Sequence, residues 1–175
     1  MKQCQIYAIS LFATLLFATA SAPPSPAQVA VSSGQLSVTG DVQRSLSLSL
    51  DDLRHQPRTS VTVPNDHQAG TQDVYEGVSL AALLKQAGVP QGSQIRGAVL
   101  ATYLVAEGAD GYRVIFSIAE VDSDFQDSGI IVADTMNGEP LAEKSGPLKL
   151  VVPHDKRPAR SVRMLQSIKV VSVPK

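Results

Sequence analysis

A cluster of positively charged side chains near the end of the sequence is the clearest candidate for chemistry. Five of the chain's 15 lysines and arginines fall between residues 149 and 163. Arginine pairs its N–H groups with phosphate oxygens, and Pro153 and Pro158 reduce the entropy lost when the loop is fixed. The cluster is therefore compatible with two interpretations, a solvated surface loop and a loop that binds a phosphorylated or pyrophosphorylated ligand. The candidate ligand-binding residues are Lys156, Arg157, Arg160 and Arg163.

Other catalytic and metal-binding patterns are missing from the sequence. There is no Gly-x-Ser-x-Gly motif for a nucleophilic serine, and there is no glycine-rich phosphate loop. The three histidines, His55, His67 and His154, are not spaced as metal ligands. Heme attachment and iron–sulfur clusters need several cysteines, whereas this chain has one. We therefore expect no metal ligands from the protein, and electron transfer would have to pass through a partner.

The composition fits one globular domain in a chain of 175 residues. Hydrophobic residues make up 43% and charged residues 18%, which supports a buried core and argues against general disorder. The formal net charge of −1 shows no basic excess, so we expect no nucleic-acid partner. A single cysteine excludes an intramolecular disulfide.

Residues 1–22 have the layout of a secretory signal peptide. Lys2 supplies the positive start, an apolar run follows from about residue 6 to residue 18, and small residues close the segment. Cleavage after Ala20 or after Ala22 fits the small-x-small rule, and Pro23 favours the first. The alternative is an uncleaved anchor. We expect a periplasmic or secreted protein whose only cysteine, Cys4, leaves with the signal.

The rest of the chain is predicted to hold a flexible leader at 23–34, rich in Pro, Ser and Ala, and one domain at 35–175. Short helices are expected at 50–55 and 79–87, with Ser49 and Ser79 as N-caps, and helical turns at 118–121 and 163–167. Alternating or β-branched patterns predict a larger number of strands. This balance predicts an α+β, mainly β fold with mixed sheets. The expected strands are 36–39, 45–50, 59–63, 71–76, 97–106, 112–116, 130–134, 147–152 and 168–173.

Several short motifs follow one another in a recognisable order. They are GDV at 40–42, YEGVSL at 75–80, DGYRV at 110–114, ADTMNGEPL at 133–141, GPLKLVVP at 146–153 and VRML at 162–165. In this order the series resembles the oxidoreductase molybdopterin-binding domain, the fold of sulfite oxidases and related periplasmic molybdoenzymes. The resemblance covers roughly residues 38–171.

The resemblance implies a molybdopterin cofactor and a sulfite-oxidase-type fold. It places the phosphate of the pterin near the loop after the VVP strand, which here contains the four cations. It also implies oxidoreductase chemistry with a periplasmic or membrane redox partner. The ligand is then a phosphorylated pterin or a similar anion, held by Lys156, Arg157, Arg160 and Arg163.

One departure from the family pattern bears directly on function. The family's enzymes ligate molybdenum with a cysteine in a C-x-G-N-x-R segment, just after the strand that corresponds to 59–63. Here that segment reads PNDHQ at 64–68, without a cysteine. Two functions remain open. One is transfer of an oxygen atom or electrons, with Asp66 or solvent in place of the thiolate. The other is a degenerate, non-catalytic periplasmic module for ligand binding or accessory interactions.

Overall fold

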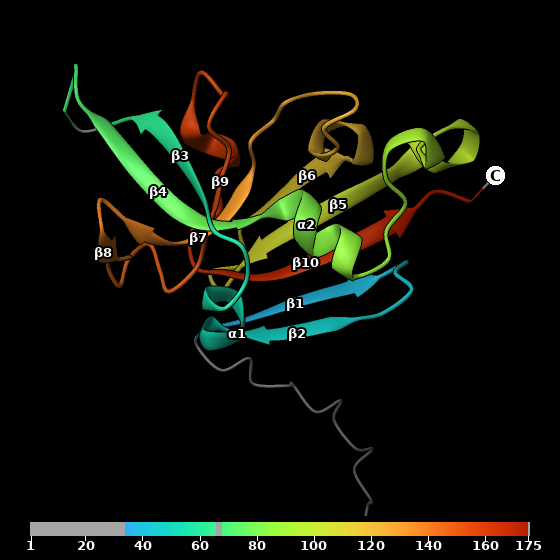
Figure 1. Cartoon of the computed structure of the whole chain (residues 1–175), viewed down its shortest axis with the longest axis horizontal. Helices are drawn as coiled ribbons and strands as arrows, with labels where there is room; N and C mark the ends of the chain where they lie inside the picture. The colour runs from blue at the N-terminus through green and yellow to red at the C-terminus, as the bar shows by residue number, and fades with distance from the viewer. Residues whose placement is uncertain (1–33, 66–67, 175) are drawn as a thin grey trace, which may run out of the picture. The chain divides into compact units, whose positions relative to one another are not determined.

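A computed structural model describes residues 34–65 and 68–174, and these contain ten strands, two α-helices and four 3₁₀ turns (Figure 1). The predicted signal peptide and nearly all of the predicted leader lie outside the described residues. The strands are β1 (Gln35–Gly40), β2 (Leu46–Ser49), β3 (Thr59–Pro64), β4 (Gln72–Ser79), β5 (Thr102–Gly108), β6 (Arg113–Ser117), β7 (Ile131–Met136), β8 (Glu139–Pro140), β9 (Lys149–Val151) and β10 (Leu165–Ser172). The helical elements are α1 (Leu50–Arg54), α2 (Leu80–Gln86), η1 (Gly92–Gln94), η2 (Gly97–Ala101), η3 (Ile118–Val121) and η4 (Pro158–Arg160).

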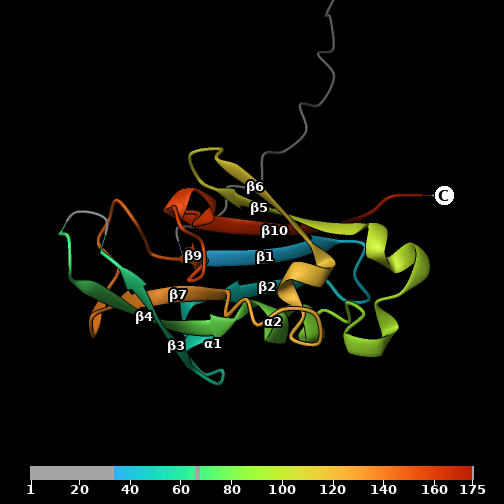
Figure 2. The same cartoon turned by 90° about the horizontal axis from the view of Figure 1, so that it is seen from above.

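The strands form two sheets of five strands each within these residues. The first has the order β2-β1-β10-β5-β6, and the second has the order β3-β4-β7-β8 with β9 also paired to β7. In the first sheet β1 and β10 are parallel and the other pairs are antiparallel, so the sheet is mixed. Figure 2 shows this sheet as one layer, with β3, β4 and β7 in a second layer. The predicted α+β, mainly β class with mixed sheets is confirmed.

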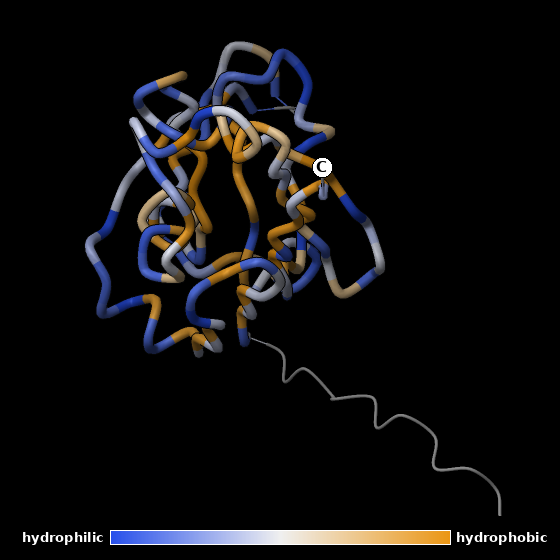
Figure 3. Tube along the Cα trace, turned by 90° about the vertical axis from the view of Figure 1, so that its right-hand side faces the viewer, coloured by the Kyte–Doolittle hydropathy of each residue, from blue (hydrophilic) through white to orange (hydrophobic). Residues whose placement is uncertain are grey.

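The main core lies between the two layers. Alternation along β1 buries Leu36 and Val38 on the same face. The helical spacing of α2 places Leu80, Leu83 and Leu84 against this core. In Figure 3 long hydrophobic stretches of the chain run through the inside of the fold, and many of the outer loops are hydrophilic.

Strand β7 of the second sheet is buried on both of its faces from Ile131 to Asp134. Along β7, Val132 points into the main core, while Ile131 and Ala133 belong to a smaller apolar cluster on the opposite face. Tyr75 of β4 and Val151 of β9 complete that small cluster. Because side chains alternate along a strand, this second face also receives the polar groups described below.

The two α-helices begin where the sequence predicts, but only the first has a side-chain cap at its N-terminus. The Ser49 side chain accepts a hydrogen bond from the Asp52 amide at 3.1 Å, and Asp52 bonds back to the Ser49 amide, which forms a capping box. Ser79 precedes α2 but makes no side-chain cap hydrogen bond. None of the helices in the described residues is long and apolar enough to span a membrane.

The strand predicted at 97–106 starts later than expected. Residues Gly97–Ala101 form a 3₁₀ turn, in which Gly97 has a φ of 58°. The strand begins at Thr102, where pairing with Ser172 of β10 begins. The apolar run alone did not show where a partner strand becomes available.

The helical turn predicted at 163–167 is wrong. Met164 has a φ of 49°, outside the right-handed helical region, and β10 begins at the next residue. The Leu165 amide donates to the carbonyl of Leu148, and β10 then pairs with both β1 and β5. Pairing on both sides of this central strand overrides the local pattern.

Candidate functional site

Two adjoining hollows on the second face of the β4–β7–β9 sheet form one cleft. The inner hollow has a volume of about 80 Å³, and the outer hollow has a volume of about 370 Å³. The outer volume is in the range typical of small-molecule sites, about 300–1,000 Å³. The two hollows share five lining residues: Asp73, Tyr75, Lys149, Pro158 and Ser161.

The floor of the cleft carries a lysine–tyrosine pair. The Lys149 Nζ donates a hydrogen bond to the Tyr75 hydroxyl at 2.9 Å and lies 4.4 Å from the centre of the Tyr75 ring. The two residues come from β9 and β4, which both pair with β7. Tyr75 is buried, and Lys149 is half-buried. Neither residue is among the ligand-binding candidates that the sequence predicts, although YEGVSL and GPLKLVVP both belong to the motif series.

An acidic side chain in the wall of the cleft is held by amide groups. The Asp73 carboxylate accepts hydrogen bonds from Asn65 Nδ2 at 3.0 and 3.1 Å and from Asn137 Nδ2 at 2.9 Å. Asn137 has a φ of 53° in the turn between β7 and β8, and its Oδ1 accepts from the Val74 amide. The Asn137 side chain therefore links the β7–β8 turn to β4 at Asp73 and Val74.

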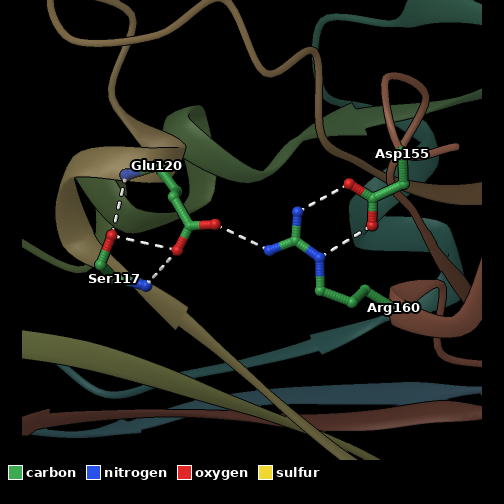
Figure 4. Close-up of polar contacts among 4 residues, drawn as sticks. All are labelled: Ser117, Glu120, Asp155 and Arg160. Atoms are coloured by element: carbon green, nitrogen blue, oxygen red, sulfur yellow. Dashed lines mark hydrogen bonds and ion pairs between the residues drawn. The ribbon is translucent and has the colours of Figure 1, made fainter.

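The predicted basic loop is fixed through Arg160. This guanidinium donates two hydrogen bonds to Asp155, at 2.7 and 2.8 Å, and one to Glu120 at 2.7 Å (Figure 4). It also lies 5.2 Å from the ring centre of Phe116. Glu120 is itself held by Ser117 in the capping box of η3. Arg160 therefore ties the loop to η3 and shares its charge with two carboxylates.

The electrostatic effects of this network are mutual. Hydrogen bonds to Asp155 and Glu120 raise the pKa of Arg160 above its usual value. The hydrogen bond from Arg160 in turn lowers the pKa of Asp155. Each partner thus favours the charged form of the other.

The remaining predicted cations lie in different places. Lys156 is exposed and lines the inner hollow, and Arg163 is exposed and lines the outer hollow. Arg157 is exposed and lines neither hollow. The cleft therefore brings together Lys156, Arg163 and the unpredicted Lys149. A hydrogen bond of 2.6 Å from the hydroxyl of Tyr112, the residue before β6, to the Ala159 carbonyl also holds this loop.

The donor groups of the cleft suit an anion better than a metal ion. Pro64 and Asn65 line the cleft at the end of β3, while Asp66 and His67 lie outside the described residues. The described residues include no cysteine, and no group of three His, Cys, Asp or Glu side chains among them could hold a metal. These residues do not fit a molybdenum ion held by a protein thiolate, because the thiolate is missing. Ammonium, guanidinium and hydroxyl groups of the cleft do fit the oxygens of an anion.

The family model of the oxidoreductase molybdopterin binding domain matches residues 23–175. The chain belongs to this family. A crystal structure of the sulfane dehydrogenase SoxCD from Paracoccus pantotrophus is similar to this molybdopterin-domain protein, with a TM-score of 0.61 and 25% sequence identity. The match covers 78% of this chain and 37% of that chain, so the domain spans well under half of that relative. A comparison with curated proteins gave no match.

The family and the structural match agree on the fold and on the class of protein. The molybdopterin-domain protein has the sulfite-oxidase-type fold that its motif series indicated. Membership of the family implies a molybdenum cofactor and an oxidoreductase-like domain. In this chain the cleft with Lys149, Lys156 and Arg163 is the candidate place for such a group.

Proposed function

We propose that the molybdopterin-domain protein is an exported binding module that holds a phosphorylated, pterin-type anion in its cleft. The observation that carries this proposal is the convergence of Lys149, Lys156 and Arg163 on one cleft. Protein–ligand sites of this kind combine a largely preformed hollow with a few placed polar groups.

The charges around the cleft support an anionic ligand. Lys156 and Arg163 form no ion pair within the described residues, so their charges are available to a ligand. The charge of Asp155 is balanced by Arg160, and Asp73 is surrounded by amide donors. A hollow lined by one sign of net charge raises the local concentration of the opposite ion.

Arg160 has a positioning role in this proposal. Its three described hydrogen bonds run to carboxylates of the protein, and these keep residues 155–160 against η3. We propose that Lys156 and Arg163 contact the anion and that Arg160 sets the position of the loop. Arg157 is exposed outside both hollows, so it does not contact the anion in this proposal but adds to the positive electrostatic potential around the loop.

The missing thiolate favours binding over catalysis. The family's usual molybdenum ligand has no counterpart among the described residues, so we derive no reaction step at a metal. A catalytic oxidoreductase with a separate redox partner is the second candidate, and it is supported by membership of the family. The two candidates differ in whether the purified, loaded protein turns over an electron acceptor.

Binding of inorganic pyrophosphate, measured by isothermal titration calorimetry at low ionic strength, tests the proposed site. We expect Lys156→Gln and Arg163→Gln each to weaken binding several-fold, because each removes a cation from the cleft wall. Arg96→Gln is the matched control, since Arg96 is an exposed cation that lines neither hollow. Wild-type protein that fails to bind pyrophosphate would contradict the proposal.

The same protein, purified from a host that makes molybdopterin, tests the identity of the ligand. We expect pterin fluorescence after oxidative release, and we expect its yield to fall in Arg163→Gln but not in Arg96→Gln. Loaded protein that reduces an electron acceptor at a steady rate would favour the catalytic candidate instead.

A further inference from the structure

We infer that Tyr75 and Lys149 form a hydrogen-bond-donating pair that recognises an oxyanion at the floor of the cleft. This inference deepens the proposed function and rests on it, because it names the groups that contact the anion. The pair joins two strands that are far apart in the chain and lines both hollows.

The direction of the Tyr75 hydroxyl follows from the chemistry of its partner. A lysine ammonium group can only donate hydrogen bonds, whereas a tyrosine hydroxyl can donate and accept. In the 2.9 Å contact the Tyr75 oxygen must therefore be the acceptor. Its own O–H proton is left to another acceptor, and the described residues supply none.

Burial makes this arrangement costly unless a ligand or solvent completes it. Tyr75 is only 6% exposed, and its ring is packed in the small apolar cluster with Ile131 and Val151. A buried donor without an acceptor costs about 1–3 kcal/mol. Because Tyr75 lines both hollows, an acceptor that enters the cleft can meet its O–H group.

The surrounding groups define the chemistry of that acceptor. Lys149 has two further N–H donors besides the one that bonds Tyr75. Ser161 and Arg163 line the same outer hollow and also offer donors. Asp73, two residues before Tyr75 on the same face of β4, already accepts three amide hydrogen bonds. A ligand group that only accepts hydrogen bonds and carries negative charge, an oxyanion, fits this donor-rich floor.

Tyr75→Phe isolates the hydroxyl with little change of shape. We expect this variant to bind pyrophosphate roughly tenfold more weakly than wild-type protein, which is the size expected for one hydrogen bond to a charged group. Lys149→Met should lose at least as much affinity, and Lys149→Arg should recover part of it. Tyr103→Phe is the matched control, because Tyr103 lies in β5 and lines neither hollow.

Two further readouts separate a direct contact from a loss of structure. The slope of log affinity against log salt concentration should be unchanged in Tyr75→Phe and shallower in Lys149→Met, because only the second variant removes a charge. The protein has no tryptophan, so a change in tyrosine near-ultraviolet absorption on binding should be visible and should disappear in Tyr75→Phe.

The outcomes separate this inference from the proposed function. If wild-type protein and Tyr75→Phe bind pyrophosphate equally and both show the absorption change, the anion site stands and the Tyr75–Lys149 pair does not contact the anion. If wild-type protein does not bind at all, both the site and the pair are refuted.

Discussion

Two arginines in this domain hold separate segments of the chain together by hydrogen bonds to carboxylate groups. Arg160 joins the basic loop to η3, and Arg58 donates to both oxygens of Asp134 in β7. Asp134 is only 3% exposed, and Thr135 donates to the same carboxylate. A charge this deeply buried is tolerated because its hydrogen bonds replace those of water.

The buried Asp134 gives a prediction about acid sensitivity. Burial raises the pKa of Asp134. Hydrogen bonds from Arg58 and Thr135, together with the charges of Arg58 and Arg54, lower it by more than burial raises it. The pKa of Asp134 is therefore below its ordinary value. Its contribution to the free energy of unfolding is therefore present above the unfolded pKa of about 3.9 and is lost as the pH falls through the lower folded pKa. We expect urea unfolding to show this loss on acidification.

Asp134→Asn tests the assignment of this effect. The variant should be less stable by about 2 kcal/mol at pH 7, the size expected when the hydrogen bonds of Arg58 lose their charged acceptor. Its stability should also change less between pH 4 and 2. Asp127→Asn is the control, since Asp127 is exposed and forms no ion pair within the described residues. An equal pH dependence in wild-type protein and Asp134→Asn would contradict the assignment.

At the scale of secondary-structure elements, the two α-helices begin after a strand and a serine but gain their first hydrogen bonds differently. Ser49 forms a reciprocal capping box with Asp52. Before α2, the Leu80 amide instead donates to the Ile130 carbonyl at 3.0 Å. A backbone acceptor thus satisfies the first amide of α2, whereas the side-chain cap that the sequence predicts at Ser79 is not formed.

This difference predicts unequal effects of the same substitution. Ser49→Ala should lower the free energy of unfolding by about 1 kcal/mol, the usual effect of removing an N-cap. Ser79→Ala should change it by only a few tenths of a kcal/mol, since no cap hydrogen bond is lost. Chemical denaturation of the two variants compares them directly, and equal losses would show that the caps do not differ.

At the scale of the whole molecule, one domain without any thiol forms around a core shared by two sheets. The parallel pairing of β1 with β10 joins the first described strand to the last. Leu36, Val38, Ile168 and Val170 of these strands all belong to the main core. Cohesion in the described domain therefore depends on packing and hydrogen bonds.

The export that we propose for the protein leads to a prediction about its covalent state. We propose that the signal segment 1–22 is removed, and with it Cys4, the single cysteine of the chain. Intact mass spectrometry of protein from the periplasm or medium should then give a first residue of Ser21 or Pro23, and a thiol reagent under denaturing conditions should find no reactive group. A labelled thiol in that fraction would contradict removal of the signal.

The sequence by itself determined the features that depend on near neighbours. Alternation identified β1, β2 and β3, the Ser49 signal located α1, and the spacing of Leu80, Leu83 and Leu84 located α2. The order of motifs indicated the family, which the match over residues 23–175 confirms. The density of cations indicated the loop at 154–163, which lies beside a cleft.

Only the tertiary structure decided how distant residues meet. It paired Lys149 with Tyr75 across 74 positions in the chain and Arg160 with Glu120 across 40. It also started β10, the central strand of its sheet, at Leu165, where the local pattern predicted a helical turn at 163–167 before a strand at 168–173. The physical reason is that periodicity and capping are set by residues within one or two turns of the chain, whereas strand neighbours and charge partners depend on which elements pack together. The sequence showed the basic loop, but only the structure showed that Lys156 and Arg163 line the cleft while Arg160 binds carboxylates of the protein.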